Sequence, residues 1–165
     1  MFKVNDYIMY GMMGVCQVID ITTESFINNT KRKYYVLNHI YSNNTIIKIP
    51  VDNEKIPMRK ILSKEDVSIL IKSMSNKETI WIDDDRKRNE QFKLMLKRGN
   101  IEDLVQLVRS IYLEKEEKKA IGKKIYKADD DIMEEAERLL NEELATILNI
   151  SPNEVSSYIS SKISQ

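Results

Sequence analysis

The chain has 165 residues, of which 42% are apolar, and this is enough to bury the core of one ordinary domain or two small ones. Its 26 basic and 26 acidic side chains cancel, which excludes a protein that is basic over its whole surface and coats nucleic acid in that way. A single cysteine excludes an internal disulfide, and with a single histidine it also excludes the common zinc sites.

Neither a membrane segment nor a secretion signal is indicated. No apolar run approaches the roughly 18 residues of a transmembrane helix. The opening residues "MFKVND" lack the basic and apolar regions of a signal peptide. We therefore expect a cytoplasmic protein without a membrane partner.

The first half of the chain has the composition of β-strands. Several short runs are rich in Val, Ile, Tyr and Thr and are separated by turns that contain Gly, Asn and Ser. They are residues 7–10, 14–21, 33–41 and 44–51. A sheet this small buries its inner face only by curling into a barrel or by packing on another element. Ser63 can cap a helix that runs to Met74, with Val67 and Ile71 at helical spacing. We expect this helix to close a first domain, residues 1–74.

The second half has the period of helices. After a linker at residues 75–79, apolar side chains recur every three or four positions in successive segments. These segments are residues 84–98, 100–112, 128–148 and 151–159. Asn100 can cap the second segment, and "SPNE" at the start of the last has the pattern of a capping box. Because strands come first and helices follow without alternation, we expect an α+β protein whose second domain, residues 75–165, is an all-helical bundle.

Residues suited to catalysis do not converge in the sequence. His39 lies in a strand pattern and Cys16 lies among apolar residues, so neither has a neighbour that would pair a nucleophile with its base. The aspartate runs 83–85 and 129–131 diverge around a helix by about 100° per residue, whereas acids are favoured at helix N-termini. We interpret them as caps rather than metal ligands, and we expect neither an enzyme nor a bound cofactor.

Residues 86–98 are the main electrostatic feature of the chain, with six bases and one acid, Glu90. At helical spacing Phe92, Met95 and Leu96 share one face, and the bases line another. The bases on that face are Arg86, Lys93 and Lys97, with Lys87 and Arg98 beside them. This basic face is either an ordinary solvated helix surface or a surface that contacts nucleic-acid phosphates.

The single tryptophan, Trp81, shortly precedes this basic segment. It is either a packing residue that fixes the helix to the linker or an apolar wedge of the kind that enters a DNA minor groove. Composition and pattern by themselves favour the packing role.

Five segments of the chain have the order and the spacing found in one known protein family. They are "FKVNDYIMYGMMGVCQV", "KRKYYVLNHIYSNNTIIKIPVDN", a tryptophan with a basic helix that ends in "RGN", "LVQLVRSIYL" and "EEAERLLNEELATILNIS". In this combination and spacing the chain resembles the CarD/CdnL family of bacterial transcription regulators, and the resemblance covers almost its whole length.

The resemblance implies that the first domain is a Tudor-like antiparallel β-barrel, which binds the β subunit of RNA polymerase largely through an exposed strand. The matching residues are Thr45, Ile46, Ile47, Lys48, Ile49 and Pro50. Lys48 stands where family members have a base that faces an acidic patch of the polymerase. Where the family has a second basic contact, this chain has Glu24.

The resemblance also implies that the helical domain binds promoter DNA at the upstream edge of the melted bubble. A tryptophan is wedged into the minor groove, and nearby bases touch phosphates. The matching residues are Trp81, Arg86, Lys87, Arg88, Lys93 and Lys97. In the family the bases follow the tryptophan almost at once, whereas here Asp83, Asp84 and Asp85 intervene.

We therefore expect a monomeric transcription regulator that binds the RNA polymerase β subunit and stabilises the promoter open complex through DNA contacts that are not sequence-specific. The alternative is a polymerase-binding module whose helical domain contacts protein rather than DNA. The acidic residues 83–85 favour this alternative, because they would repel phosphates, and the basic face of residues 86–97 opposes it.

Overall fold

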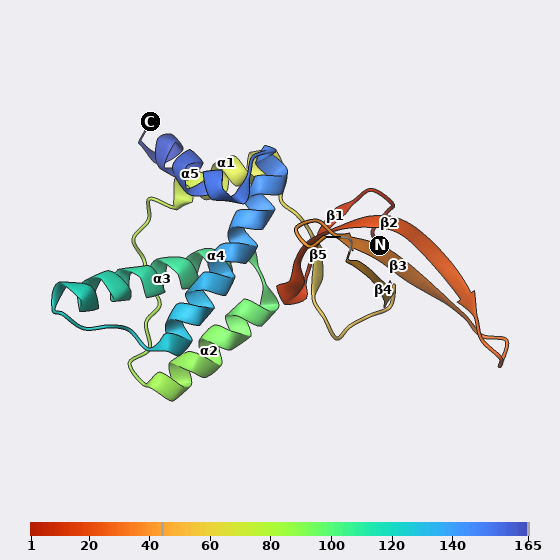
Figure 1. The fold of residues 1–165 in the computed structure, drawn as a ribbon, viewed down its shortest axis with the longest axis horizontal. Coiled ribbons are helices and arrows are strands. Elements are labelled where there is room, and N and C mark those ends of the chain that lie inside the picture. The colour runs from red at the N-terminus through yellow and green to blue at the C-terminus, as the bar shows by residue number, and fades with distance from the viewer. Residues whose placement is uncertain (44, 165) are drawn as a thin grey trace. The chain divides into compact units, whose positions relative to one another are not determined.

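The computed structural model describes residues 1–43 and 45–164 of the chain. The chain divides into two compact units, Met1–Ile61 and Leu62–Gln165. The first is an antiparallel sheet, and the second consists of helices (Figure 1). The predicted α+β class, with strands before helices, is confirmed.

The first unit is one five-stranded antiparallel sheet in the order β4-β3-β2-β1-β5. The strands are β1 (Tyr7–Tyr10), β2 (Gly14–Ser25), β3 (Lys31–His39), β4 (Ile46–Pro50) and β5 (Met58–Lys60), with a 3-10 helix, η1 (Gly11–Met13), between β1 and β2. β4 and β5 are its edges, and no pairing between them occurs within the described residues. The sheet is therefore open, and the closed Tudor-like barrel stays a prediction.

One face of this sheet carries the core of the unit. The buried residues there are Ile8, Tyr10, Cys16, Val18, Tyr35, Leu37 and Ile49. They alternate along their strands because successive side chains of a strand point to opposite faces. The N-terminal segment covers part of this face: Phe2 donates its N–H to the Tyr35 hydroxyl at 3.0 Å, and the two rings lie 5.7 Å apart.

A β-bulge interrupts the pairing of β2 with β3. Val18 stands opposite Leu37, but the next matched pair is Asp20 with Val36, so Ile19 is the extra residue. The insertion shifts the alternation by one position. As a result Ile21 packs against the core, and residues of β2 beyond it keep that new alternation.

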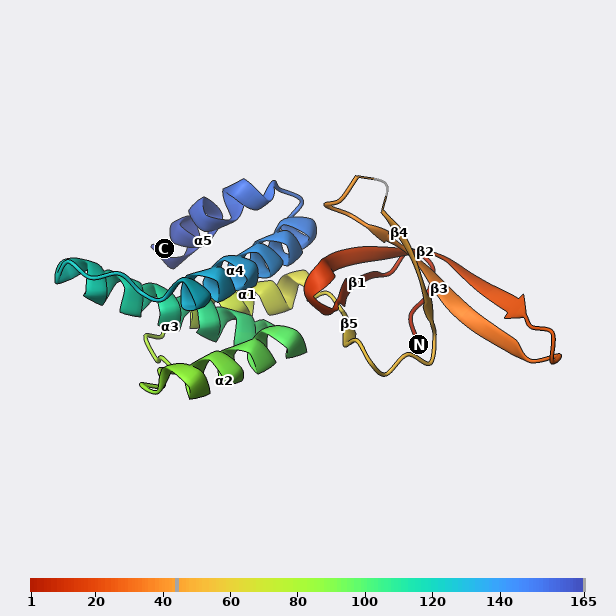
Figure 2. The same ribbon diagram turned by 60° about the horizontal axis from the view of Figure 1, so that its bottom comes forward.

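The second unit contains five α-helices and a short 3-10 helix in its described residues. They are α1 (Lys64–Ser73), α2 (Asp85–Arg98), α3 (Ile101–Ala120), α4 (Lys127–Leu148), η2 (Pro152–Glu154) and α5 (Val155–Ile163). α2, α3 and α4 pack on one another, with α3 and α4 side by side (Figure 2). No helix of the described residues is long and apolar enough to cross a bilayer.

The helix α1 belongs to this second unit, because it packs against α4 and α5. The division after Ile61 therefore differs by one helix from the predicted domains, residues 1–74 and 75–165.

Capping follows the sequence signals at some helix ends and not at others. The Ser63 hydroxyl accepts the Asp66 N–H at 3.1 Å, and Ser151 and Glu154 form the predicted capping box. The Asp84 carboxylate accepts the Lys87 N–H at 2.9 Å, as expected for an acid at a helix start. The Asn100 side chain makes no capping bond. Between α2 and α3 the chain turns at Gly99, whose φ of 67° is a left-handed conformation that favours glycine.

Candidate binding surfaces

In the sheet unit, β4 offers a free strand edge. Its inner neighbour is β3, and no strand pairs with its other side within the described residues. Thr45 accepts the His39 N–H and Val51 donates its N–H to Lys33, so the odd-numbered residues bond to β3. Because the two sides alternate in an antiparallel strand, the main-chain groups of Ile46 and Lys48 face the free edge.

The side chains of the predicted polymerase-binding segment divide between the two faces. Ile49 is buried and Ile47 packs against the core, whereas Ile46 is 55% exposed and Lys48 is exposed. Pro50 ends the strand, and Thr45 precedes it. The segment thus combines an anchored inner row of isoleucines with an outer row that is available to a partner.

Lys48 is not a free charge. It forms an ion pair with Glu24 of β2, and its Nζ lies 5.6 Å from the centroid of the Tyr34 ring. Both charged side chains remain about 40% exposed, at 45% for Lys48 and 39% for Glu24. An ion pair this accessible to water is weak and easily exchanged.

In the helical unit, α2 presents the two faces that its sequence predicts. Phe92, Met95 and Leu96 are buried. Its exposed bases are Arg86, Lys87, Lys93, Lys97 and Arg98. Arg86 Nε donates to Glu90 at 3.3 Å, and Arg98 pairs with Asp103 at 3.3 Å. Arg86, Lys87, Lys93 and Lys97 are thus in position on one helix to meet an anionic surface.

Arg88 departs from this pattern, because only 2% of it is exposed. Its guanidinium donates to Asp129 at 2.7 Å, to Asp85 at 2.9 Å and to the Ile82 carbonyl at 2.8 Å. The hydrogen bonds that Arg88 donates to the Asp129 carboxylate hold the pKa of Arg88 above its ordinary value. A buried guanidinium with these bonds has no accessible face for a phosphate, which corrects the prediction that Arg88 contacts DNA.

Arg88 instead positions Trp81. Its guanidinium carbon lies 4.3 Å from the centroid of the indole, close enough for a cation–π contact. A second partner is Phe92, whose ring meets Trp81 edge-to-face with the ring centroids 6.0 Å apart. Trp81 is half-buried. The indole is thus both a packing residue and a partly accessible one, and its orientation depends on a buried ion pair.

Asp85 and Tyr126 complete this cluster. Hydrogen bonds from Arg88 and then Tyr126 lower the pKa of the Asp85 carboxyl, and the same contact with Asp85 raises the pKa of Tyr126. Of the acids between the tryptophan and the bases, Asp84 caps α2 and Asp85 binds Arg88. Both carboxylates therefore have structural partners.

Residues 2–62 match the family model described as the CarD-like/TRCF RID domain. The sheet unit is a CarD-like/TRCF RID domain. This is a domain of RNA polymerase-interacting, transcription-related proteins, so the resemblance noted in the sequence is confirmed over these residues. No curated protein sequence matches the chain. The match ends before α1, so the helical unit is interpreted from its own residues.

Within the RID domain, the two residues considered for catalysis lie opposite each other. Cys16 of β2 is paired with His39 of β3. Cys16 is fully buried in the core of the sheet, where a substrate has no access. In the described residues no group of three or more His, Cys, Asp or Glu side chains is placed to hold a metal ion.

Outside the RID domain, the turn between α3 and α4 carries a basic cluster that the sequence analysis overlooked. Residues 115–127 contain six lysines and two acids. Five of the lysines line a hollow of about 480 Å³: Lys115, Lys119, Lys123, Lys124 and Lys127. The sixth, Lys118, lies 6.0 Å from the Trp81 ring centroid and 5.7 Å from that of Tyr126. Charge counts over short windows would have found this cluster, whereas counts over each half of the chain concealed it.

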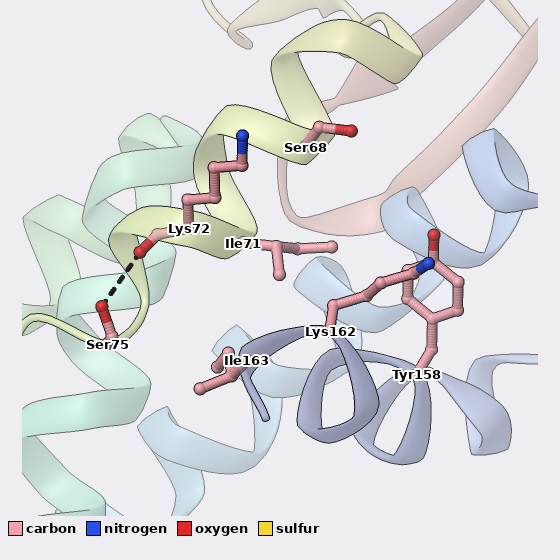
Figure 3. Close-up of a pocket in the computed structure, with 7 residues that line it drawn as sticks. All are labelled: Ser68, Ile71, Lys72, Ser75, Tyr158, Lys162 and Ile163. Carbon is pink, nitrogen blue, oxygen red and sulfur yellow. Dashed lines mark hydrogen bonds between the residues drawn. The ribbon is translucent and has the colours of Figure 1, made fainter. Parts of the chain in front are cut away.

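A second hollow of about 490 Å³ lies between α1 and α5. Figure 3 shows Ile71 and Lys72 on the α1 wall and Lys162 and Ile163 on the α5 wall. Lys162 lies over the ring of Tyr158, with Nζ 5.5 Å from the centroid. The lining of this hollow contains no carboxylate. Its residues come from α1, α5 and Ser75, and none of them belongs to the cluster around Trp81.

Proposed function

We propose that the protein is a non-catalytic transcription regulator that docks on the β subunit of RNA polymerase and stabilises the promoter open complex. The sheet unit binds the polymerase through the free edge of β4. The helical unit contacts promoter DNA at the upstream edge of the bubble without reading its sequence. The protein acts as a monomer in the cytoplasm and needs no cofactor.

The observation that carries docking is the free edge of β4 in an RNA polymerase-interacting domain. A partner strand added to this edge would gain main-chain hydrogen bonds from Ile46 and Lys48, and specificity would come from the outer side chains. The adjacent core residues Ile47 and Ile49 hold the strand in place before the partner arrives. The Tudor-like character of the domain is part of this proposal, with the outer edge of β4 left unpaired, because pairing of β4 with β5 would occupy the edge that a partner strand needs.

DNA contact is supported by the exposed bases of α2 beside a partly accessible indole. Arg86, Lys87, Lys93 and Lys97 would neutralise phosphates, and Trp81 would act as the wedge. The lysines of the α3–α4 turn extend the basic surface toward Trp81 through Lys118. Binding the open complex more tightly than the closed one would stabilise it by mass action.

The alternative keeps the docking and replaces DNA with a protein partner for the helices. It is favoured by Asp83, Asp84 and Asp85, which are all exposed at the start of α2. Structural partners for Asp84 and Asp85 weaken this argument, because their carboxylates have a role in the helix itself.

The test is footprinting of a mixture of RNA polymerase, promoter and the full chain at two salt concentrations, together with the lifetime of the open complex. We expect upstream protection that fades as salt rises, because phosphate contacts release counterions. Lys93→Gln should shorten the lifetime, whereas Lys64→Gln, on the exposed start of α1, serves as the matched control. If the protein binds the polymerase but does not protect upstream DNA, the protein-binding alternative is favoured. If the protein does not bind the polymerase, the proposal is overturned.

A further inference from the structure

The outer face of the sheet gathers two cations around one tyrosine. The register pairs Glu24 with Arg32, Tyr34 with Pro50, and Val36 with Lys48. Because Tyr35 and Ile49 lie in the core, alternation places Arg32, Tyr34, Lys48 and Glu24 together on the opposite face.

The two cations are held by the same ring. The Arg32 guanidinium carbon lies 5.9 Å from the Tyr34 centroid, and Lys48 Nζ lies 5.6 Å from it. Each cation also has a carboxylate from its own chain: Glu24 for Lys48, and Asp52 for Arg32 at 3.2 Å. All four charged side chains are at least 39% exposed, with Asp52 at 74%. Such pairs are easily exchanged for an incoming carboxylate.

The site adjoins the free edge of β4. A strand that pairs with this edge would lie about 4.8 Å from β4 and would place alternate side chains on the face of Lys48. An acidic side chain opposite Lys48 would then be within reach of its ammonium group, because directly opposed residues have Cβ atoms about 5 Å apart. A neighbouring acid on the same strand face would approach the Tyr34 ring and Arg32.

We propose that Arg32, Tyr34 and Lys48 form a carboxylate-binding site for an acidic extended segment of RNA polymerase, and that Glu24 occupies this site in the free protein. The proposal rests on the proposed docking through β4 and adds two things to it. Arg32 is the second base of the docking face, contributed by β3 rather than by β2. Glu24 is an internal competitor, so the partner's carboxylate must displace it from Lys48.

The test compares the affinities of full-length variants for RNA polymerase core enzyme at low and high salt, by biolayer interferometry. Lys33→Gln is the matched control, because Lys33 is an exposed base next to Arg32 whose side chain alternates to the other face. Arg32→Gln should weaken binding by about 2- to 5-fold relative to this control, the range of an exposed ion pair. Glu24→Gln should tighten binding by a similar factor of about 2- to 5-fold at low salt, and the gain should vanish in a Lys48→Gln background. Thermal melting checks that each variant is folded.

The outcomes separate this inference from the proposed function. If Lys48→Gln weakens binding but Arg32→Gln behaves like the control, or if Glu24→Gln does not tighten binding, the carboxylate site is overturned while docking through β4 stands. If Lys48→Gln has no effect on binding, the carboxylate site is overturned, and docking can rest only on the main-chain bonds of β4; if the unmodified protein does not bind RNA polymerase, both are overturned. The site is supported only when both Arg32→Gln and Glu24→Gln change the affinity in the stated directions.

Discussion

Two ion pairs, one in each unit, show how the surroundings of a base decide its use. Lys48 and Glu24 meet on an outer sheet face, where both stay well exposed to water. Arg88 and Asp129 meet between helices, where each side chain is only 3% exposed. The residue types are similar, but the first pair can be exchanged for a partner and the second cannot. A base near a proposed nucleic-acid or protein contact can therefore be assigned to binding only if its side chain is exposed.

The difference also has an energetic side. An exposed pair contributes about 0–1 kcal/mol to stability, because water screens it and the side chains lose freedom. A buried pair is different, because removal of one partner leaves the other charge without compensation. Variants of the two pairs should therefore diverge most in stability.

The largest effect is expected from Asp129→Ala, which leaves the Arg88 guanidinium buried without its main acceptor. The free energy of unfolding should fall by about 3–5 kcal/mol. Urea denaturation measures it, and Asp131→Ala is the matched control, because Asp131 pairs with Lys127 on the surface and should cost no more than about 0.5 kcal/mol. Similar losses for the two variants would show that burial does not distinguish these pairs.

A smaller loss is expected from Trp81→Ala, which removes a half-buried indole from contact with Phe92 and Arg88. The free energy of unfolding should fall by about 1–3 kcal/mol. Trp81→Phe should retain most of the stability, because a ring remains against Phe92. If Trp81→Phe nevertheless shortens the open-complex lifetime as much as Trp81→Ala, the indole acts on DNA. If the open-complex lifetime instead falls only in proportion to the loss of unfolding free energy, Trp81 is a packing residue only.

Lys48→Gln should scarcely alter the stability of the protein, with a change of at most about 1 kcal/mol. Its effect should be on binding instead, where loss of one charge contact weakens the affinity for RNA polymerase by about 5-fold. Paired urea denaturation and affinity measurements check this split. A large loss of stability would mean that the Lys48–Glu24 pair supports the sheet rather than the docking face.

The smallest expected effect is that of Asp85 on stability at acid pH. The pKa of Asp85 is lowered in the folded protein, chiefly by its hydrogen bond from Arg88. Because its pKa is lowered by folding, ionised Asp85 stabilises the folded state at pH values above the ordinary carboxyl pKa. This stabilisation is lost as the pH falls through the lower pKa of the folded protein. Melting temperatures recorded from about pH 5 down to about pH 2.5 should therefore fall less steeply for Asp85→Asn than for the unmodified protein. Parallel curves would show that Asp85 makes no linked contribution.

Local patterns predicted the elements well. The alternation of Val, Ile and Tyr located β1, β2, β3 and β4 but not the short strand β5, and helical spacing predicted the buried face of Phe92, Met95 and Leu96. These features depend on neighbours within a few positions, which a sequence displays directly.

The roles of individual charges could not be predicted in the same way. Arg88 is buried by an acid 41 positions away, and Lys48 is paired with an acid 24 positions away. Helical periodicity carries no information about either partner. The free edge of β4 and the open sheet likewise depend on how five strands are ordered, which composition does not report.

The bulge at Ile19 has a consequence for how relatives of this protein could diverge. Glu24 stands opposite Arg32 on the outer face because Ile19 is left unpaired, so that Asp20 is opposite Val36. Deletion of Ile19 would remove the bulge and keep these pairs, since Asp20 would then follow Val18 directly in the ladder. Loss or gain of one residue between Asp20 and Glu24, with the bulge retained, would instead move Glu24 to the inner face. A single codon lost or gained in β2, away from β4, can thus switch the internal competitor off or on. Insertion and deletion, as well as substitution, are routes by which such a domain could change how tightly it binds its partner.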